Sequence, residues 1–196
     1  MQEGFSPFSH PIIFDNDNAL LTASEKLNSE MQGRRSVRKF SDKPIPKEVI
    51  DNLLRIAASA PSGAHKQPWI FCVIAKEDLK ALIREAAEKE EYTNYHGRMS
   101  EEWLEDLKKF GTDWHKDFLT TAPYLVVVFK KSYDLESDGG KAKNYYVSES
   151  VGIACGFLLS AIHQLGLVSL THTPSPMNFL GELLKRPSNE KAFLLI

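Results

Sequence analysis

Apolar residues recur at helical spacing in several long stretches of the chain. Residues 47–60 place their apolar side chains on one side of a helix, and residues 77–89 are rich in alanine, leucine, glutamate and lysine, so both stretches predict helices. Residues 144–165 predict a long helix that is apolar almost all round in its second half, and that is either central and buried or dimer-forming. Gly152 and Gly156 on this helix would permit close approach of a second helix.

Two shorter helices are expected nearer the ends of the chain. The first covers residues 23–32, and Thr22 with Glu25 has the form of a capping box at its start. The second runs over residues 178–185, with Asn178 as its cap. Residues 1–22 precede the first helix and are expected to form an N-terminal arm over the surface or a partner.

Four short runs of β-branched and aromatic residues predict buried strands, at residues 69–75, 124–130, 167–171 and 192–196. The intervening segment 132–141 is polar and predicts a loop. Because helices and strands mix without regular βαβ repeats, we expect an α+β fold. No Gly-x-Gly-x-x-Gly turn follows a strand, which argues against a Rossmann dinucleotide site.

Composition limits the class of protein. With 196 residues and 42% hydrophobic content, the chain is long enough for one domain with a substantial core. A net charge of −2 gives no basic stripe for nucleic acid. The longest apolar run, residues 151–162, is shorter than the ~20 residues that span a bilayer. Cys72 and Cys155 lie in apolar runs and are expected to be buried free thiols, so we expect a cytoplasmic protein without membrane contact.

A cluster of arginines stands out in residues 34–40. Arg34, Arg35, Ser36 and Arg38 offer guanidinium and hydroxyl donors that suit phosphate oxygens. From these residues alone, a solvated basic turn or a patch resembling a nuclear-localisation signal is the favoured interpretation. A second segment, residues 59–69, is a loop of small residues that ends in Gln-Pro-Trp and leads into a predicted strand.

In this order and spacing, the two segments resemble the FMN-dependent nitroreductase family, and the resemblance extends from about Arg34 to the last residue. It implies a nitroreductase-like fold, with a central, mostly antiparallel sheet flanked by helices. It also implies an intertwined homodimer with FMN at the interface. In relatives the chain continues past the position of Ile196 into a segment that supplies one more arginine to the flavin phosphate.

The same resemblance implies which residues contact FMN. The arginine-rich segment would hold the phosphate and ribityl end, and the turn at residues 171–174 would lie near the ring, with the Thr173 hydroxyl donating to flavin N5 and favouring one-electron steps. A simple turn is the alternative for that segment. The expected cofactor-binding residues are Arg34, Arg35, Ser36, Val37, Arg38, Pro61, Ser62, Thr171, His172 and Thr173.

Residues 90–118 differ in composition from their surroundings, because charged and aromatic residues interleave there without a continuous apolar stripe. The segment is either a mobile lid or a surface helical hairpin. Glu91 and Tyr95 are four residues apart and would share a helical face. With Lys116 they resemble the trio that closes over the amino-acid end of the substrate in the iodotyrosine deiodinase branch of the family.

Physical chemistry agrees with that resemblance, because a buried zwitterion needs a partner for each charge. Glu91 would bind the ammonium, Lys116 the carboxylate, and Tyr95 would cover the ring. By resemblance, the backbone N–H of Ala64 would meet the substrate phenolate. No spacing of histidines suggests a metal site.

These inferences predict an FMN-dependent oxidoreductase that reductively dehalogenates 3-iodotyrosine and 3,5-diiodotyrosine, releasing iodide and tyrosine. Its catalytic residues would be Thr173, Tyr95, Glu91 and Lys116. A broad-specificity NAD(P)H-dependent FMN nitroreductase would share the arginine segment and fold without needing the trio. A non-catalytic flavin- or amino-acid-binding protein would keep the same sites.

Overall fold

The computed structural model of the chain describes residue 10 and residues 12–196. It divides into two units, Met1–Arg34 and Arg35–Ile196. Most of the first half of the predicted N-terminal arm therefore lies outside the described residues.

The N-terminal unit contains one helix, α1 (Asp17–Gln32). Asn16 caps it, since its extended backbone lets the side chain accept a hydrogen bond from the backbone N–H of Ala19. The predicted start at residue 23 with a Thr22 capping box was wrong, because Thr22 already lies inside the helix. None of the sixteen residues of α1 is buried.

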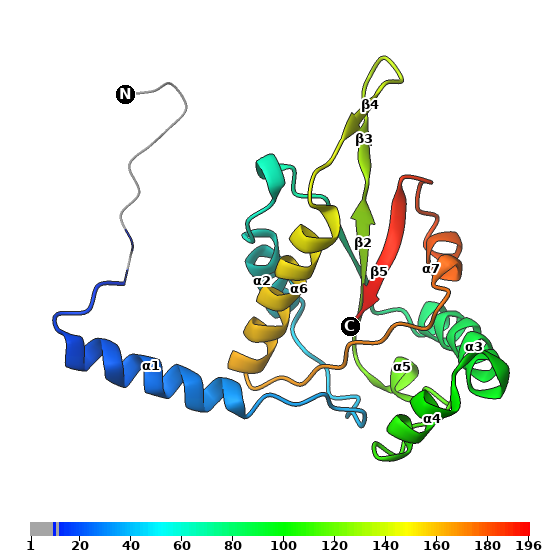
Figure 1. The fold of residues 1–196 in the computed structure, drawn as a ribbon, viewed down its shortest axis with the longest axis horizontal. Helices are drawn as coiled ribbons and strands as arrows, with labels where there is room; N and C mark the ends of the chain where they lie inside the picture. Colours follow the sequence, from blue (N-terminus) through cyan, green and yellow to red (C-terminus); the bar gives the residue numbers. More distant parts are fainter. Residues whose placement is uncertain (1–9, 11) are drawn as a thin grey trace. The chain divides into compact units, whose positions relative to one another are not determined.

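A three-stranded antiparallel sheet lies at the centre of the larger unit (Figure 1). Its strands are β1 (Trp69–Ile74), β2 (Leu125–Lys131) and β5 (Glu190–Leu195), with β2 in the middle. The first five residues of β2 are buried, as expected for a strand covered on both faces. The predicted α+β fold with an antiparallel sheet is confirmed.

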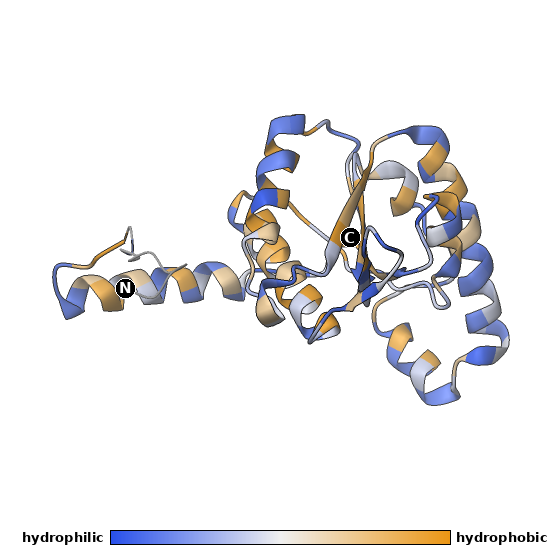
Figure 2. Cartoon of the chain, turned by 90° about the horizontal axis from the view of Figure 1, so that it is seen from above, coloured by the Kyte–Doolittle hydropathy of each residue, from blue (hydrophilic) through white to orange (hydrophobic). Residues whose placement is uncertain are grey.

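Helices cover both faces of this sheet (Figure 1). Because side chains alternate along a strand, Val126 and Val128 of β2 join one core cluster with α2 (Lys47–Ala58) and α6 (Val147–Gln164). Val127 and Phe129 join a second cluster, with residues from α3 (Glu77–Thr93), α5 (Phe118–Thr121) and α7 (Asn178–Leu183). Figure 2 shows the central strands coloured mainly as hydrophobic.

The segment after α3 continues as a π-helical turn, η2 (Asn94–Arg98), followed by α4 (Glu101–Lys108). A 3-10 turn, η1 (Gly63–His65), precedes β1. Among the described residues, no helix is long and apolar enough to cross a membrane.

Two predictions about residues 132–146 were wrong. The polar segment is a hairpin of β3 (Tyr133–Leu135) and β4 (Lys141–Lys143), closed by a turn in which Gly139 has φ +86°. Strands this short and polar carry no apolar alternation that could reveal them. The long helix begins at Val147, because Tyr146 has a left-handed backbone with φ 47°.

Two further predictions near the C-terminal end also need correction. Residues 167–171 form no strand, and only Ser169 pairs there, in a single parallel bridge with Ser36. The last helix starts after Met177 and its N-terminus receives no side-chain hydrogen bond, so the predicted cap by Asn178 was wrong.

Candidate active site

Glu91, Tyr95 and Lys116 come together in the structure. The Lys116 ammonium nitrogen lies 3.5 Å from a carboxylate oxygen of Glu91, and both side chains are buried. The same nitrogen lies 5.4 Å from the centre of the Tyr95 ring. The Tyr95 hydroxyl donates to the carbonyl of Thr112 at 3.4 Å. Two opposite charges therefore face each other beside an aromatic ring.

Burial changes the proton affinity of Glu91 and Tyr95. Removal from water raises the pKa of Glu91, and the neighbouring Lys116 ammonium only partly counteracts that rise. Burial likewise raises the pKa of the Tyr95 hydroxyl. The tyrosine is therefore a neutral hydrogen-bonding group at physiological pH.

Glu88 fixes the backbone at Lys116. One carboxylate oxygen of Glu88 accepts the backbone N–H of Lys116 at 2.7 Å, and the same oxygen accepts the Arg84 guanidinium at 2.7 Å. Arg84 also hydrogen-bonds Asp117, the next residue along the chain. Sequence reasoning missed Glu88, although it lies three residues before Glu91 and therefore on the same side of α3.

The turn at residues 171–174 is anchored to β5. His172 donates its backbone N–H to the carbonyl of Leu195 at 2.7 Å and accepts from the Leu195 N–H at 3.0 Å. The Thr171 and Thr173 side chains on either side are exposed. The His172 ring packs edge-on against Phe118, with 5.5 Å between ring centres. Since Phe118 is two residues beyond Lys116, this contact joins the turn to the segment that carries the lysine.

The His172 side chain is constrained by its buried surroundings. Its Nε2 is buried and has no hydrogen-bond partner among the described residues. Burial, assisted by the nearby Lys116 charge, lowers the pKa of His172 to about 3. The imidazole is therefore neutral under ordinary conditions.

The arginine-rich segment lies beside the same region. Ser36 pairs with Ser169, and the backbone N–H of Val37 donates to the Ser169 carbonyl at 3.1 Å. Arg35 and Arg38 are exposed, and the Arg38 guanidinium lies 5.2 Å from the centre of the Phe110 ring. Residues 35–38 thus lie next to the segment around Ser169, which leads into the turn at residues 171–174. Arg34 belongs to the N-terminal unit.

The third predicted flavin segment lies elsewhere in the fold. The Gly63 N–H donates to the Ser150 hydroxyl near the start of α6, at 3.3 Å. The other segments lie beside Ser169, beyond the end of α6 at Gln164. Since a helix rises ~1.5 Å per residue, about 20 Å of helix separates the two places. One chain therefore holds the Pro61–Ser62–Ala64 loop and the arginine segment at opposite ends of α6 (Figure 1).

Ala64 and its neighbours have an unusual backbone. Ala64, His65 and Gln67 all have positive φ, between 46° and 54°, a region that residues with a side chain rarely occupy. Ser62 supports the loop by accepting the Gln67 N–H at 2.9 Å. At Gly63 a side chain would collide with the Tyr145 carbonyl, because an added Cβ would lie 2.9 Å from that oxygen.

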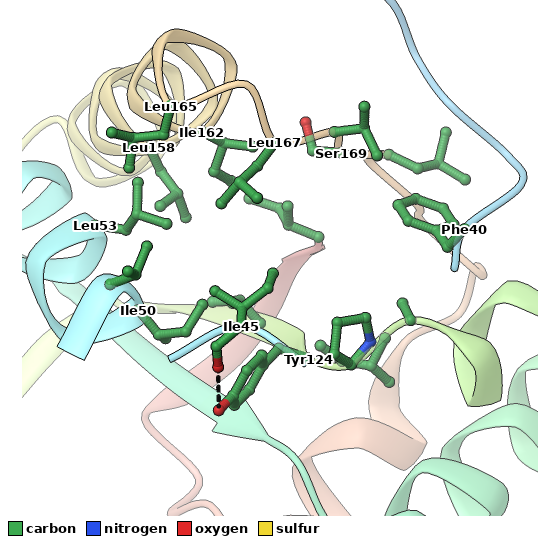
Figure 3. A pocket seen from close by; sticks show the side chains of 18 of the residues that line it. Phe40, Ile45, Ile50, Leu53, Tyr124, Leu158, Ile162, Leu165, Leu167 and Ser169 are labelled. Carbon is green, nitrogen blue, oxygen red and sulfur yellow. Dashed lines mark hydrogen bonds between the residues drawn. The ribbon is translucent and has the colours of Figure 1, made fainter. Parts of the chain in front are cut away.

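An apolar cavity of about 570 Å³ lies between α2, α6 and the sheet, and Phe118, Ser169 and His172 line it on the side of the 171–174 turn. Figure 3 shows Leu53, Leu158 and Ile162 pointing into it from the two helices, and the hydrogen bond from the Tyr124 hydroxyl to the Ile45 carbonyl at its edge. Glu91, Tyr95, Lys116 and Thr173 do not line it. Sequence patterns indicated the helices around this cavity but not the cavity itself.

Within the described part of the chain, no group of three or more His, Cys, Asp or Glu side chains is placed to hold a metal ion.

The family model described as "Nitroreductase family" matches residues 31–193. An iodotyrosine deiodinase of Haliscomenobacter hydrossis is 63% identical over 177 residues, which cover 90% of this chain and 80% of that protein. The chain belongs to the nitroreductase family, in its iodotyrosine deiodinase branch.

Other members of the branch show similar coverage. An iodotyrosine deiodinase of Hydra vulgaris is 45% identical over 196 residues, covering all of this chain and 71% of that protein. A crystal structure of an oxidized iodotyrosine deiodinase bound to FMN and 3-iodo-L-tyrosine superimposes with a TM-score of 0.77, at 33% identity and 86% coverage of each chain. The family predicted from the two motifs is confirmed.

Proposed function

We propose that the chain is an FMN-dependent iodotyrosine deiodinase, which converts 3-iodotyrosine and 3,5-diiodotyrosine to tyrosine and iodide. The observation that carries this proposal is the buried pair of Glu91 and Lys116 beside the Tyr95 ring. Reduction of nitro compounds in general does not require two buried, opposite charges in the site. A free amino acid offers the complementary pair.

Each member of the trio has a separate task. The Glu91 carboxylate accepts hydrogen bonds from the substrate ammonium, and the Lys116 ammonium donates to the substrate carboxylate. Tyr95 lies against the substrate and excludes water from it. Glu88 holds the backbone of Lys116, so that the lysine is positioned before substrate arrives.

FMN, when bound, supplies the electrons that break the carbon–iodine bond. The residues present fit this cofactor, because Arg35, Ser36 and Arg38 line an extended segment next to the turn with the exposed Thr173 hydroxyl. The guanidinium groups suit the phosphate. Thr173 is the proposed donor to flavin N5, and the Ala64 N–H the proposed donor to the substrate phenolate.

The active site is shared between two copies of the chain. In one copy the Ala64 loop and the arginine segment lie at opposite ends of α6. Gly152, Ile153, Gly156 and Phe157 form an open strip on that helix: Ile153 and Phe157 are exposed, and no described atom lies within 4 Å of a Cβ added at either glycine. Antiparallel pairing of two α6 helices would bring the loop of one copy to the arginine segment of the other.

Its location is proposed to be the cytoplasm, on the evidence of the two cysteines. Cys72 and Cys155 are both free thiols, and proteins that mature in oxidising compartments tend to pair their cysteines.

The proposal is tested by titrating the FMN-loaded protein with 3-iodotyrosine while following flavin fluorescence. Tyrosine is the control for the halogen, and 3-iodotyramine, which lacks the carboxylate, is the control for the zwitterion. We expect tight quenching by 3-iodotyrosine, weak quenching by both controls, and iodide release after reduction with dithionite. Equal weak responses to all three, with rapid reduction of nitro compounds by NAD(P)H, would favour the broad nitroreductase instead.

A further inference from the structure

Asn94 lies between Glu91 and Tyr95 in the chain and is nearly as buried as Glu91. It follows α3 directly, three residues after Glu91 and one before Tyr95, and only 8% of it is exposed. Residues three and four apart share a helical face. The Asn94 side chain therefore belongs to the same face as the proposed ammonium-binding carboxylate.

The polar atoms of Asn94 connect three pieces of structure. Its side-chain Nδ2 donates to the Ser175 carbonyl at 2.9 Å. Its backbone carbonyl accepts the Met99 N–H at 2.9 Å and so closes the π-helical turn. Its Oδ1 accepts the Arg98 guanidinium at 3.5 Å. Turns of this type within helices are rare and often occur at functional sites.

The Ser175 carbonyl is a well-fixed acceptor. Ser175 stands two residues after Thr173, between the buried Pro174 and the exposed Pro176. The ring of each proline restricts φ, which limits the orientations open to the peptide groups between them. The bond from Asn94 thus spans 81 positions of sequence and joins the substrate-binding helix to the turn that carries the Thr173 hydroxyl.

We propose that Asn94 is a positioning residue that holds Glu91 and Tyr95 in register with the Thr171–Thr173 turn. The inference rests on the proposed function, since it assigns substrate to one side of the bond and flavin to the other. Loss of the Nδ2 donor removes the bond to the Ser175 carbonyl, which is partly buried, and frees the helix end to shift. Glu91 and Tyr95 are then no longer held in a fixed position relative to the Thr171–Thr173 turn.

Three variants of the FMN-loaded protein test this role. Asn94→Asp keeps the size and the Arg98 contact but removes the donor, and Asn94→Leu removes all side-chain hydrogen bonds. Thr93→Ala is the matched control, because within the described part of the chain the exposed Thr93 hydroxyl bonds only the Lys89 carbonyl, one turn earlier in the same helix. We expect both Asn94 variants to raise the Kd for 3-iodotyrosine roughly tenfold at unchanged FMN content, and Thr93→Ala to leave the Kd unchanged.

The pH dependence separates positioning from bulk packing. A protonated aspartic acid can donate to the Ser175 carbonyl, whereas leucine cannot. The Kd ratio between Asn94→Asp and wild type should therefore fall as the pH decreases, and the ratio for Asn94→Leu should stay constant. A constant ratio for both variants would overturn the assignment.

Hydrogen exchange without added substrate gives a second, independent readout. In Asn94→Leu, we expect faster exchange in residues 91–98 and 171–176, with β1 and β2 unchanged. Unchanged exchange in the two segments, or equal acceleration throughout the sheet, would overturn the proposal. If the wild-type protein fails to bind 3-iodotyrosine, the proposed function fails, while exchange still decides whether Asn94 couples the two segments.

Discussion

The Lys116 ammonium nitrogen lies 3.5 Å from a carboxylate oxygen of Glu91, with only 5% and 8% of the two side chains exposed. Burial of either charge alone would be unfavourable, and the pair makes the site electrically neutral. A zwitterion inserted between them preserves that neutrality, because each protein charge exchanges one opposite partner for another. A ligand with only one charge cannot do so.

Single substitutions in this pair should therefore weaken substrate binding strongly. We expect Lys116→Ala or Glu91→Gln each to cost about 2–5 kcal/mol in the binding of 3-iodotyrosine, measured by flavin fluorescence. The double variant should lose less than the sum, since neither charge is left unpaired. Lys109→Ala is the control, because Lys109 pairs with Asp106 at the surface. A loss below ~0.5 kcal/mol in each single variant would place the zwitterion elsewhere.

Substrate binding should also respond to acid through Glu91. Burial raises the pKa of this carboxyl above its usual 4.5, so Glu91 takes up its proton at a higher pH than an exposed glutamate would. The anion that the ammonium requires is lost as the pH falls through that raised value. We expect the Kd of wild type to increase there, relative to Glu91→Gln, which has no titrating group. Parallel pH profiles of the two proteins would contradict this assignment.

Helix α6 offers a direct test of the shared active site. Gly156→Leu adds a side chain into open space within one chain and replaces a poor helix former with a good one. The variant should fold with at least the thermal stability of an isolated wild-type chain. It should nevertheless elute as a monomer in light-scattering chromatography and retain little FMN. Surface substitution Gly97→Ala, at another open glycine in the π turn, is the control. A dimeric Gly156→Leu protein with full FMN content would remove α6 from the interface.

His172 should make folding stability sensitive to acid. Its folded-state pKa is about 3 against an ordinary 6.5, so the unfolded chain binds the proton first. This contribution to the free energy of unfolding is complete above pH 6.5 and is lost as the pH falls toward 3, at up to roughly 1.4 kcal/mol per pH unit. His172→Phe keeps the ring against Phe118 and should flatten that dependence in urea denaturation. His96→Gln, an exposed control, should not, and an unchanged slope in His172→Phe would show that other groups cause it.

The elements with a strong apolar period were predictable from sequence. Strand β2 and helices α2 and α6 were expected within a few residues, because each buries a continuous apolar face. The β3–β4 hairpin was missed because its short, polar strands contribute no residue to either core cluster of the described residues. The strand expected at 167–171 was wrong because, apart from one bridge to Ser36, no described strand pairs along it.

The site residues likewise divide into those with a local sequence signal and those without one. Local spacing alone placed Glu91 and Tyr95 on one helical face. The approach of Lys116, 25 positions after Glu91, depends on how the chain returns over α3, and the expectation for it came from family resemblance. Asn94 and Ser175 are 81 positions apart, and neither residue carries a local signal for their bond.

Ala64, His65 and Gln67 have left-handed backbone conformations, and the free energy needed to adopt them is spent when the chain folds. Each such residue is disfavoured by about 1–3 kcal/mol relative to an ordinary backbone, and the loop keeps this conformation through Ser62, Ser150 and the close approach of Tyr145 at Gly63. Ligand binding therefore requires no further free energy to order this loop. The amide of Ala64 is thus preorganised, and a phenolate that docks there need not reshape the peptide that receives it.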